Sequence, residues 1–212
     1  MRQIEDMNGI TAVGENLNWY RGFIQGKTRI TLAWIFAFFL GFSAREYPAL
    51  PGVMLCLLGA LLRFWASGYL RKDTRPAVGG PYSYVRNPLY LGTYWMALGT
   101  AWAIENWILL AVATVLFAGI YHFIILDEEL KLRRIFGEPY SQYCQLVSRF
   151  FPRVWPPFFR APKSLLMGVN PEKSHHFFSI SLAMKNKAYE ALLTFLALMA
   201  FVSGSASVWK HF

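Results

Sequence analysis

Residues 89–126 read LYLGTYWMALGTAWAI, then EN, then WILLAVATVLFAGIYHFIIL, and this stretch decides the fold class. The first apolar run covers Leu89 to Ile104 and the second covers Trp107 to Leu126. Runs of this length are typical of helices that cross a membrane, which need about 20 apolar residues. Only Glu105 and Asn106 separate them, so the sequence predicts a tight antiparallel hairpin of two membrane helices.

Three further apolar runs flank this hairpin, at residues 30–44, 49–70 and 188–208. A backbone exposed to lipid must satisfy its own hydrogen bonds, so we expect an all-α bundle of about five transmembrane helices. The run at 30–44 is short for a span, and serines weaken the end of the last run. The predicted organisation is a cytoplasmic N-terminal segment (1–29), a transmembrane core (30–160), an interfacial or cytoplasmic segment (161–187), and a C-terminal helix with its tail (188–212).

Composition supports a membrane protein. Hydrophobic residues make up 55% of the chain and charged residues only 16%, yet the net charge is +9. The mean hydropathy of +0.31 lies outside the balance of soluble domains. A basic surplus in such a chain favours an anionic membrane surface over nucleic acid as the partner. Cys56 and Cys144 lie in different contexts and are interpreted as unpaired.

The basic residues alternate between the connecting segments. Segments 71–88 and 127–187 are rich in arginine and lysine, as is the region before residue 30, whereas the Glu105–Asn106 turn has none. By the positive-inside rule, the N-terminus and both long polar segments are expected at the cytoplasmic face.

These two polar segments contain most of the residues with chemical potential. One reads GPYSYVRNPLYLG over residues 80–92, and the other reads DEELKLRR over 127–134, followed by FGEPYSQY over 136–143. The hairpin brings Arg86, Asn87 and Tyr90 near Glu128 and Glu129, at the membrane boundary, where polar clusters tend to be functional. The structural alternative is an aromatic belt, with glutamates that pair with Arg133 one helical turn on.

Together these motifs resemble the isoprenylcysteine carboxyl methyltransferase family, to which the phospholipid methyltransferases are related. The resemblance covers residues 55–152 and includes Leu62-Arg63-Phe64-Trp65 upstream. The sequence departs from the better-known members at Asn87, where they carry histidine. Unlike histidine, asparagine cannot carry charge, although it both donates and accepts hydrogen bonds.

The resemblance implies S-adenosylmethionine as methyl donor and a lipophilic acceptor, either an isoprenylcysteine-like carboxylate or a lipid. Arginine suits the carboxylate of the donor, and glutamate suits its ammonium group or ribose hydroxyls. Tyrosine suits the adenine ring by stacking or the sulfonium by cation–π attraction. The residues expected to bind the cofactor are Tyr82, Arg86, Asn87, Pro88, Tyr90, Leu91, Gly92, Glu128 and Glu129. Arg63 and Glu129 are the expected catalytic residues. If the acceptor is a thiol or amine, Glu129 or a tyrosine is the candidate base.

Several alternatives remain open at this point. Arg63 lies inside an apolar run and could instead extend toward the headgroups. A membrane oxidoreductase of the sterol reductase type, using a nicotinamide cofactor, and a non-enzymatic membrane protein are the competing functions. No zinc-spaced cysteine set is present and the His175-His176 pair is weak support for a metal, so no metal site is expected. Close packing is expected through the small residues from Gly92 to Gly99 and at Gly204. This packing would be within or between chains, so the oligomeric state is open.

Overall fold

The computed structural model describes residues 35, 38–40, 43–44, 46–71, 76–151 and 177–210. The predicted segment 1–29 lies outside these residues, as does most of the predicted helix 30–44. The described elements are α4 (Leu50–Ser67), the 3-10 turn η1 (Gly80–Ser83), α5 (Pro88–Ala103), α6 (Trp107–Phe136), α7 (Glu138–Leu146), α9 (Ile180–Lys185) and α10 (Tyr189–Trp209). The all-α prediction is therefore confirmed for the described part of the chain.

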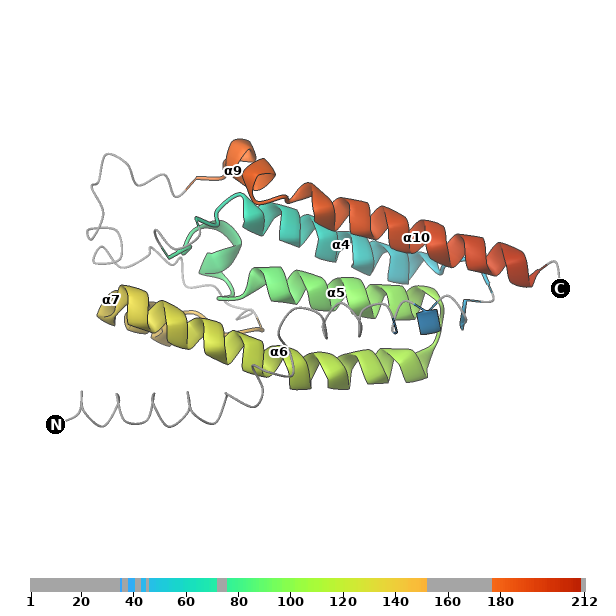
Figure 1. Ribbon diagram of the computed structural model, residues 1–212, viewed down its shortest axis with the longest axis horizontal. Coiled ribbons are helices and arrows are strands. Elements are labelled where there is room, and N and C mark those ends of the chain that lie inside the picture. The colour runs from blue at the N-terminus through green and yellow to red at the C-terminus, as the bar shows by residue number, and fades with distance from the viewer. Residues whose placement is uncertain are drawn as a thin grey trace.

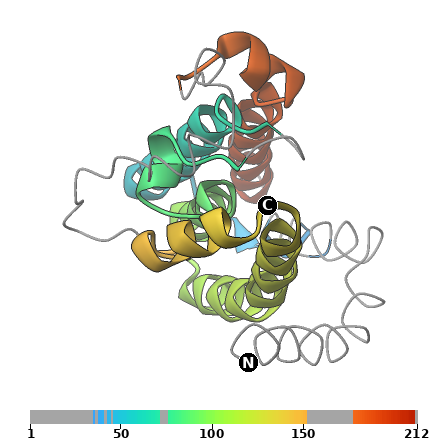
Figure 2. The ribbon, with the colours of Figure 1, turned by 90° about the vertical axis from the view of Figure 1, so that its left-hand side faces the viewer.

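Four long helices run side by side in the order α10, α4, α5, α6, and η1, α7 and α9 gather at one end of them (Figures 1 and 2). Of the described helices, α4, α6 and α10 are long and apolar enough to cross a membrane. Large apolar side chains on α6 face outward, with Ile108 78% exposed and Val115 70% exposed. Such a surface suits lipid and not water, so the protein is an integral membrane protein. The predicted count of about five spans is not confirmed.

The predicted hairpin is confirmed: α5 ends at Ala103 and α6 begins at Trp107. The side chain of Asn106 accepts a hydrogen bond of 2.9 Å from the backbone N–H of Leu109, which caps the start of α6. Glu105 adopts a positive φ of 54°, so the backbone reverses within this turn.

The predicted end of this helix at residue 126 is wrong, because α6 continues for another ten residues to Phe136. Residues 127–136 are good helix formers, and the helix stops only at Gly137, whose φ is 61°. At about 1.5 Å per residue, α6 is about 45 Å long, well beyond the roughly 30 Å of a bilayer core. Its charged end, which includes Glu128 and Glu129, therefore extends beyond the hydrocarbon as a helix and not as a loop.

Helices α4 and α5 approach closely through two glycines on each helix. The two glycines of a helix lie seven residues apart, at Gly52 and Gly59 on α4 and at Gly92 and Gly99 on α5. A Cβ placed on Gly59 would lie 2.5 Å from the carbonyl oxygen of Gly92, and one on Gly52 would lie 2.6 Å from that of Gly99. These distances are too short for any side chain, so only glycine permits this contact. The close packing expected of Gly92 and Gly99 thus occurs within the chain, and it sets the position of the start of α5 relative to α4. The same expectation is not met at Gly204, where an added Cβ would have no atom of the described residues within 4 Å.

The end of α4 is held by the turn that follows α9. The side-chain amide of Asn186 donates hydrogen bonds to the carbonyl oxygens of Ser67 (2.9 Å) and Leu70 (2.6 Å). Ser67 is the last residue of α4, and Leu70 lies three residues beyond it, so the amide joins the helix end to the segment that follows. The link fixes the start of α10 beside α4, so that α10 covers the bundle at the end where the polar residues gather.

Candidate functional site

The site begins in the loop that leads into α5. Gly80 has a φ of 57°, which starts the η1 turn, and Pro81 and Tyr82 are buried behind it. The backbone N–H of Arg86 then donates a 2.8 Å hydrogen bond to the carbonyl oxygen of Ser148. Val85 and Ser148 form an isolated parallel bridge. Residues 85–87 and 147–149, far apart in sequence, therefore lie alongside each other.

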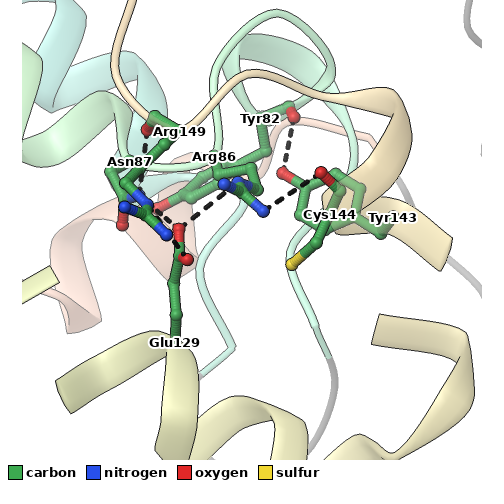
Figure 3. A network of polar contacts seen from close by, with 7 residues as sticks. All are labelled: Tyr82, Arg86, Asn87, Glu129, Tyr143, Cys144 and Arg149. Carbon is green, nitrogen blue, oxygen red and sulfur yellow. Dashed lines mark hydrogen bonds and ion pairs between the residues drawn. The ribbon is translucent and has the colours of Figure 1, made fainter. Parts of the chain in front are cut away.

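A buried ion cluster forms where this loop meets α6 (Figure 3). Oε1 of Glu129 lies 3.3 Å from Nε of Arg86, and Oε2 lies 3.2 Å from Nε of Arg149. The side-chain amide of Asn87 donates to Oε1 at 3.3 Å and to the backbone oxygen of Arg149 at 3.0 Å. The Glu129 side chain is only 4% exposed. A carboxylate this buried requires such partners, since desolvation of an unpaired charge is costly.

Arg86 has one further anchor within this cluster. Its Nη1 donates a 3.1 Å hydrogen bond to the backbone oxygen of Cys144 at the end of α7. The hydroxyl of Tyr143, on the same helix, donates a 2.7 Å hydrogen bond to the backbone oxygen of Tyr82. Helix α7 therefore supports both the arginine and the turn that precedes it.

Glu128, the neighbour of Glu129, has a different environment. Its Oε2 accepts a 2.7 Å hydrogen bond from the hydroxyl of Tyr90. The ring of Tyr90 packs edge-on against Tyr121 with 5.4 Å between centroids, and Tyr121 stacks on Phe117 at 3.9 Å. An accessible carboxylate thus lies beside a set of aromatic rings.

Arg63 is the cation inside the bundle. Its Nη1 donates hydrogen bonds to the backbone oxygen of Leu89, at 3.2 Å, and to the hydroxyl of Thr93. Among the described residues, no carboxylate forms an ion pair with it. Gly92 makes room for its stem, because a Cβ there would lie 2.6 Å from Cγ of Arg63. Within the described part of the chain, the guanidinium is held in place by these neutral groups.

Several of these residues, but not Glu129 or Arg149, line one cavity of about 770 Å³. Its polar end is lined by Tyr82, Arg86, Asn87, Tyr90, Tyr121, Glu128 and Lys131. Its other end lies between α5 and α10 and is lined by Met96, Ala97, Thr100, Thr194 and Leu198. From Pro88 to Thr100 the cavity follows α5 for about 18 Å, at about 1.5 Å per residue. It therefore joins a charged, aromatic end to a mostly apolar interior, a combination typical of small-molecule sites.

The structure brings seven of the residues predicted from the sequence to this cavity: Arg63, Tyr82, Arg86, Asn87, Pro88, Tyr90 and Glu128. Leu91 is buried, and Gly92 is used for packing against α4. Glu129 belongs to the ion cluster and is not part of the cavity lining. The roles assigned to these residues from the sequence stay predictions.

Sequence reasoning missed Arg149, Thr93 and Tyr121 as site residues, together with the contribution of α10 through Glu190, Thr194 and Leu198. Arg149 looked like one more basic residue of a cytoplasmic segment. No local signal in the sequence shows that α10 returns to cover a cavity formed nearly 100 residues earlier.

The hydroxyl of Tyr82 is buried and has no hydrogen-bond partner in the part of the chain that the structure describes. Burial raises the pKa of Tyr82, as does the charge of Glu128, while Arg63 opposes the rise. Burial also raises the pKa of Tyr140 and of Tyr143. All three phenols are neutral near pH 7, so Tyr82 is available at the cavity wall as a hydrogen-bond donor.

The family model of the phospholipid methyltransferases matches residues 48–139, which include α4, α5, α6 and the start of α7. The resemblance to membrane methyltransferases seen in the motifs is therefore confirmed over this core. No solved structure matches the chain.

Three curated relatives are similar to parts of the chain. A nickel-cobalt-cadmium resistance protein, NccN, of Alcaligenes xylosoxydans xylosoxydans is 32% identical over 56% of this chain and 54% of its own length. The cobalt-zinc-cadmium resistance protein CzcN of Cupriavidus metallidurans is 33% identical over 49% of this chain and 47% of its own. The protein-S-isoprenylcysteine O-methyltransferase of Schizosaccharomyces pombe is 31% identical over 39% of this chain and 35% of its own. The chain thus spans about half the length, or less, of these relatives.

Among the described residues, no group of three or more histidine, cysteine, aspartate or glutamate side chains is placed to hold a metal ion. The pair His175-His176 lies outside the described residues.

Proposed function

We propose, on the premise that residues 48–139 form a membrane core of the phospholipid methyltransferase type, that the protein transfers a methyl group from S-adenosylmethionine to a lipophilic acceptor. The observation that carries this proposal is the single cavity with a charged, aromatic end and an apolar interior. A polar donor and an apolar acceptor have to meet in one space, and this cavity offers suitable walls for both.

The polar end fits the chemistry of the donor. The accessible carboxylate of Glu128 suits the donor's ammonium group or ribose hydroxyls, and Arg86 suits its carboxylate. The rings of Tyr90 and Tyr121 offer faces for adenine or for the sulfonium. The buried hydroxyl of Tyr82 has no hydrogen-bond partner among the described residues, as expected for a group that a ligand completes.

When bound, the donor supplies an already activated methyl group, so the chain has to contribute orientation and exclusion of water. We assign the apolar tail of the acceptor to the end lined by Met96, Ala97 and Leu198. Arg63 lies between this end and the donor residues, and it is assigned to contact the acceptor's polar head. Glu129 is held by two arginines outside the cavity lining, so we give it a positioning role for Arg86 and Asn87.

The polar end is proposed to face the cytoplasm, as is the N-terminus, because basic residues flank this end and the Glu105–Asn106 turn has none. The pair Glu105→Cys and Arg134→Cys, each in a Cys144→Ser background, tests this orientation. A maleimide that does not cross membranes is expected to label position 105 in intact cells and position 134 only after permeabilisation. The reverse pattern would contradict the orientation.

The function itself is tested by calorimetric titration of the detergent-purified protein with S-adenosylhomocysteine. Glu128→Gln is expected to weaken binding at least tenfold, which corresponds to about 1.4 kcal/mol. Glu105→Gln removes the same charge at the opposite end of the hairpin and is expected to leave binding unchanged.

Absence of binding by the folded wild-type protein would refute the donor assignment. If reduced nicotinamide adenine dinucleotide phosphate bound instead, the competing oxidoreductase function would take its place.

A further inference from the structure

Residues 147–150 form a strap across the loop that carries Arg86, and no sequence motif pointed to it. The strap contacts this loop through the backbone bond from Arg86 to Ser148 and through the Asn87 amide, which donates to the backbone oxygen of Arg149. Phe150 continues the strap into the aromatic group, with its ring 5.5 Å from that of Phe117. The strap also lies beyond residue 139, where the family match ends.

Arg149 changes the charge balance of the ion cluster. Two guanidinium groups share the single carboxylate of Glu129, and they use different oxygens: Arg86 lies by Oε1 and Arg149 by Oε2. With Asn87 neutral, the cluster has a surplus of one positive charge. Without Arg149, the negative charge of Glu129 would pair with Arg86 alone and would neutralise the positive charge of that arginine.

The contact between Arg86 and Glu129 is an ion pair without a hydrogen bond at Nε. Nε of Arg86 lies within ion-pair distance of Oε1, but this buried atom makes no hydrogen bond to any described residue. The side chain of Arg86 is 8% exposed and reaches the cavity wall, whereas that of Arg149 is 38% exposed. The surplus charge is therefore available to the cavity through Arg86.

We propose that Arg149 is a positioning residue: by holding Oε2 of Glu129, it leaves Arg86 with the positive charge that binds the carboxylate of the methyl donor. This inference rests on the proposed function, because it takes the ligand at Arg86 to be that donor. It assigns to Arg149 an effect on one chemical group of the ligand and not on the whole site.

Two ligands separate this role from a merely structural one. S-adenosylhomocysteine has an amino-acid carboxylate, and 5′-methylthioadenosine has the same adenosine and a thioether without the amino-acid group. Titration of the detergent-purified protein should show that Arg149→Gln weakens S-adenosylhomocysteine binding at least tenfold. Binding of 5′-methylthioadenosine should stay within twofold of wild type. Arg149→Lys, which keeps the charge, should restore most of the preference for S-adenosylhomocysteine.

The control is Arg134→Gln, which removes the same charge from an exposed position on α6 and should change neither affinity. Equal weakening of both ligands by Arg149→Gln, or no weakening at all, would overturn the inference while leaving the proposed function intact. If Arg149→Gln does not fold, Arg149→Lys decides, and loss of the preference in that variant would count against the role. If the wild-type protein binds neither ligand, it is the proposed function that fails.

Discussion

Helix α5 makes two different kinds of contact with the rest of the molecule, one along its glycine-containing part and one at its start. From Gly92 to Gly99, α5 contacts α4 through glycines, and backbone lies directly on backbone. At its start, Arg86 and Asn87 attach the helix to α6 and to the strap through the buried carboxylate of Glu129. The glycine contact leaves no space for an added side chain. The ion cluster is destabilised when one of its charged partners is removed. The two regions should therefore respond differently to substitution.

The largest effect is expected for Gly59→Leu. The new side chain would meet the backbone of Gly92, which cannot move without shifting α5. Overpacking typically costs about 1–3 kcal/mol, and a backbone obstacle places this change at or beyond the upper end. We expect loss of folded protein in detergent, measured by size-exclusion chromatography and thermal unfolding. Gly119→Leu, at a site with no atom within 4 Å, is the matched control, and an equal loss there would show that the glycine contact is not the cause.

Glu129→Gln tests the charged contact. It leaves Arg86 and Arg149 without their carboxylate, and removal of one partner of a buried ion pair costs about 3–5 kcal/mol. Because Arg149 is partly exposed, we expect the lower end of that range in the free energy of unfolding. Glu128→Gln should instead weaken donor binding with little loss of stability, because the side chain of Glu128 lines the cavity. Similar stability losses in the two variants would contradict the division of roles between the adjacent glutamates.

Alkaline pH tests the contribution of the buried tyrosines near the ion cluster to the stability of the protein. The pKa values of Tyr82, Tyr140 and Tyr143 are raised by burial, so an unfolded chain releases these protons near pH 10 while the folded protein retains them. The contribution of these tyrosines to stability is therefore constant below pH 10 and falls above it, by about 1.4 kcal/mol per pH unit for each of them. Unfolding measured between pH 9 and about 11 should show a shallower fall for Tyr140→Phe. The exposed Tyr84→Phe serves as control, and an unchanged slope in Tyr140→Phe would contradict the assignment.

The smallest effect is expected at the far end of the hairpin. Asn106→Ala removes the side-chain cap of α6 and should cost about 1 kcal/mol of stability, without changing donor affinity. Asn106→Asp keeps an acceptor oxygen and should restore the stability. A change in donor affinity in either variant would mean that the two ends of the hairpin are coupled and do not respond independently to substitution.

Much of this protein followed from local features of the sequence. The lengths of the apolar runs fixed a helical membrane protein, and the two-residue turn after Ile104 fixed the hairpin, because each depends only on neighbouring residues. The hairpin then placed the Arg86 loop near Glu128 and Glu129 by connectivity alone. The end of α6 was misjudged because it was placed where the apolar run ends, at Leu126, although most of the charged residues that follow are good helix formers.

Only the tertiary structure distinguished Glu128 from Glu129. Successive residues of an α-helix point about 100° apart, so one glutamate reaches the cavity and the other reaches the buried cluster. Which one does so depends on how α6 is rotated against α5, and this rotation is set by packing between segments distant in sequence. The same reason hides Arg149 and α10 from sequence reasoning. Their roles depend on where the chain returns after α7, and neither spacing nor composition contains that information.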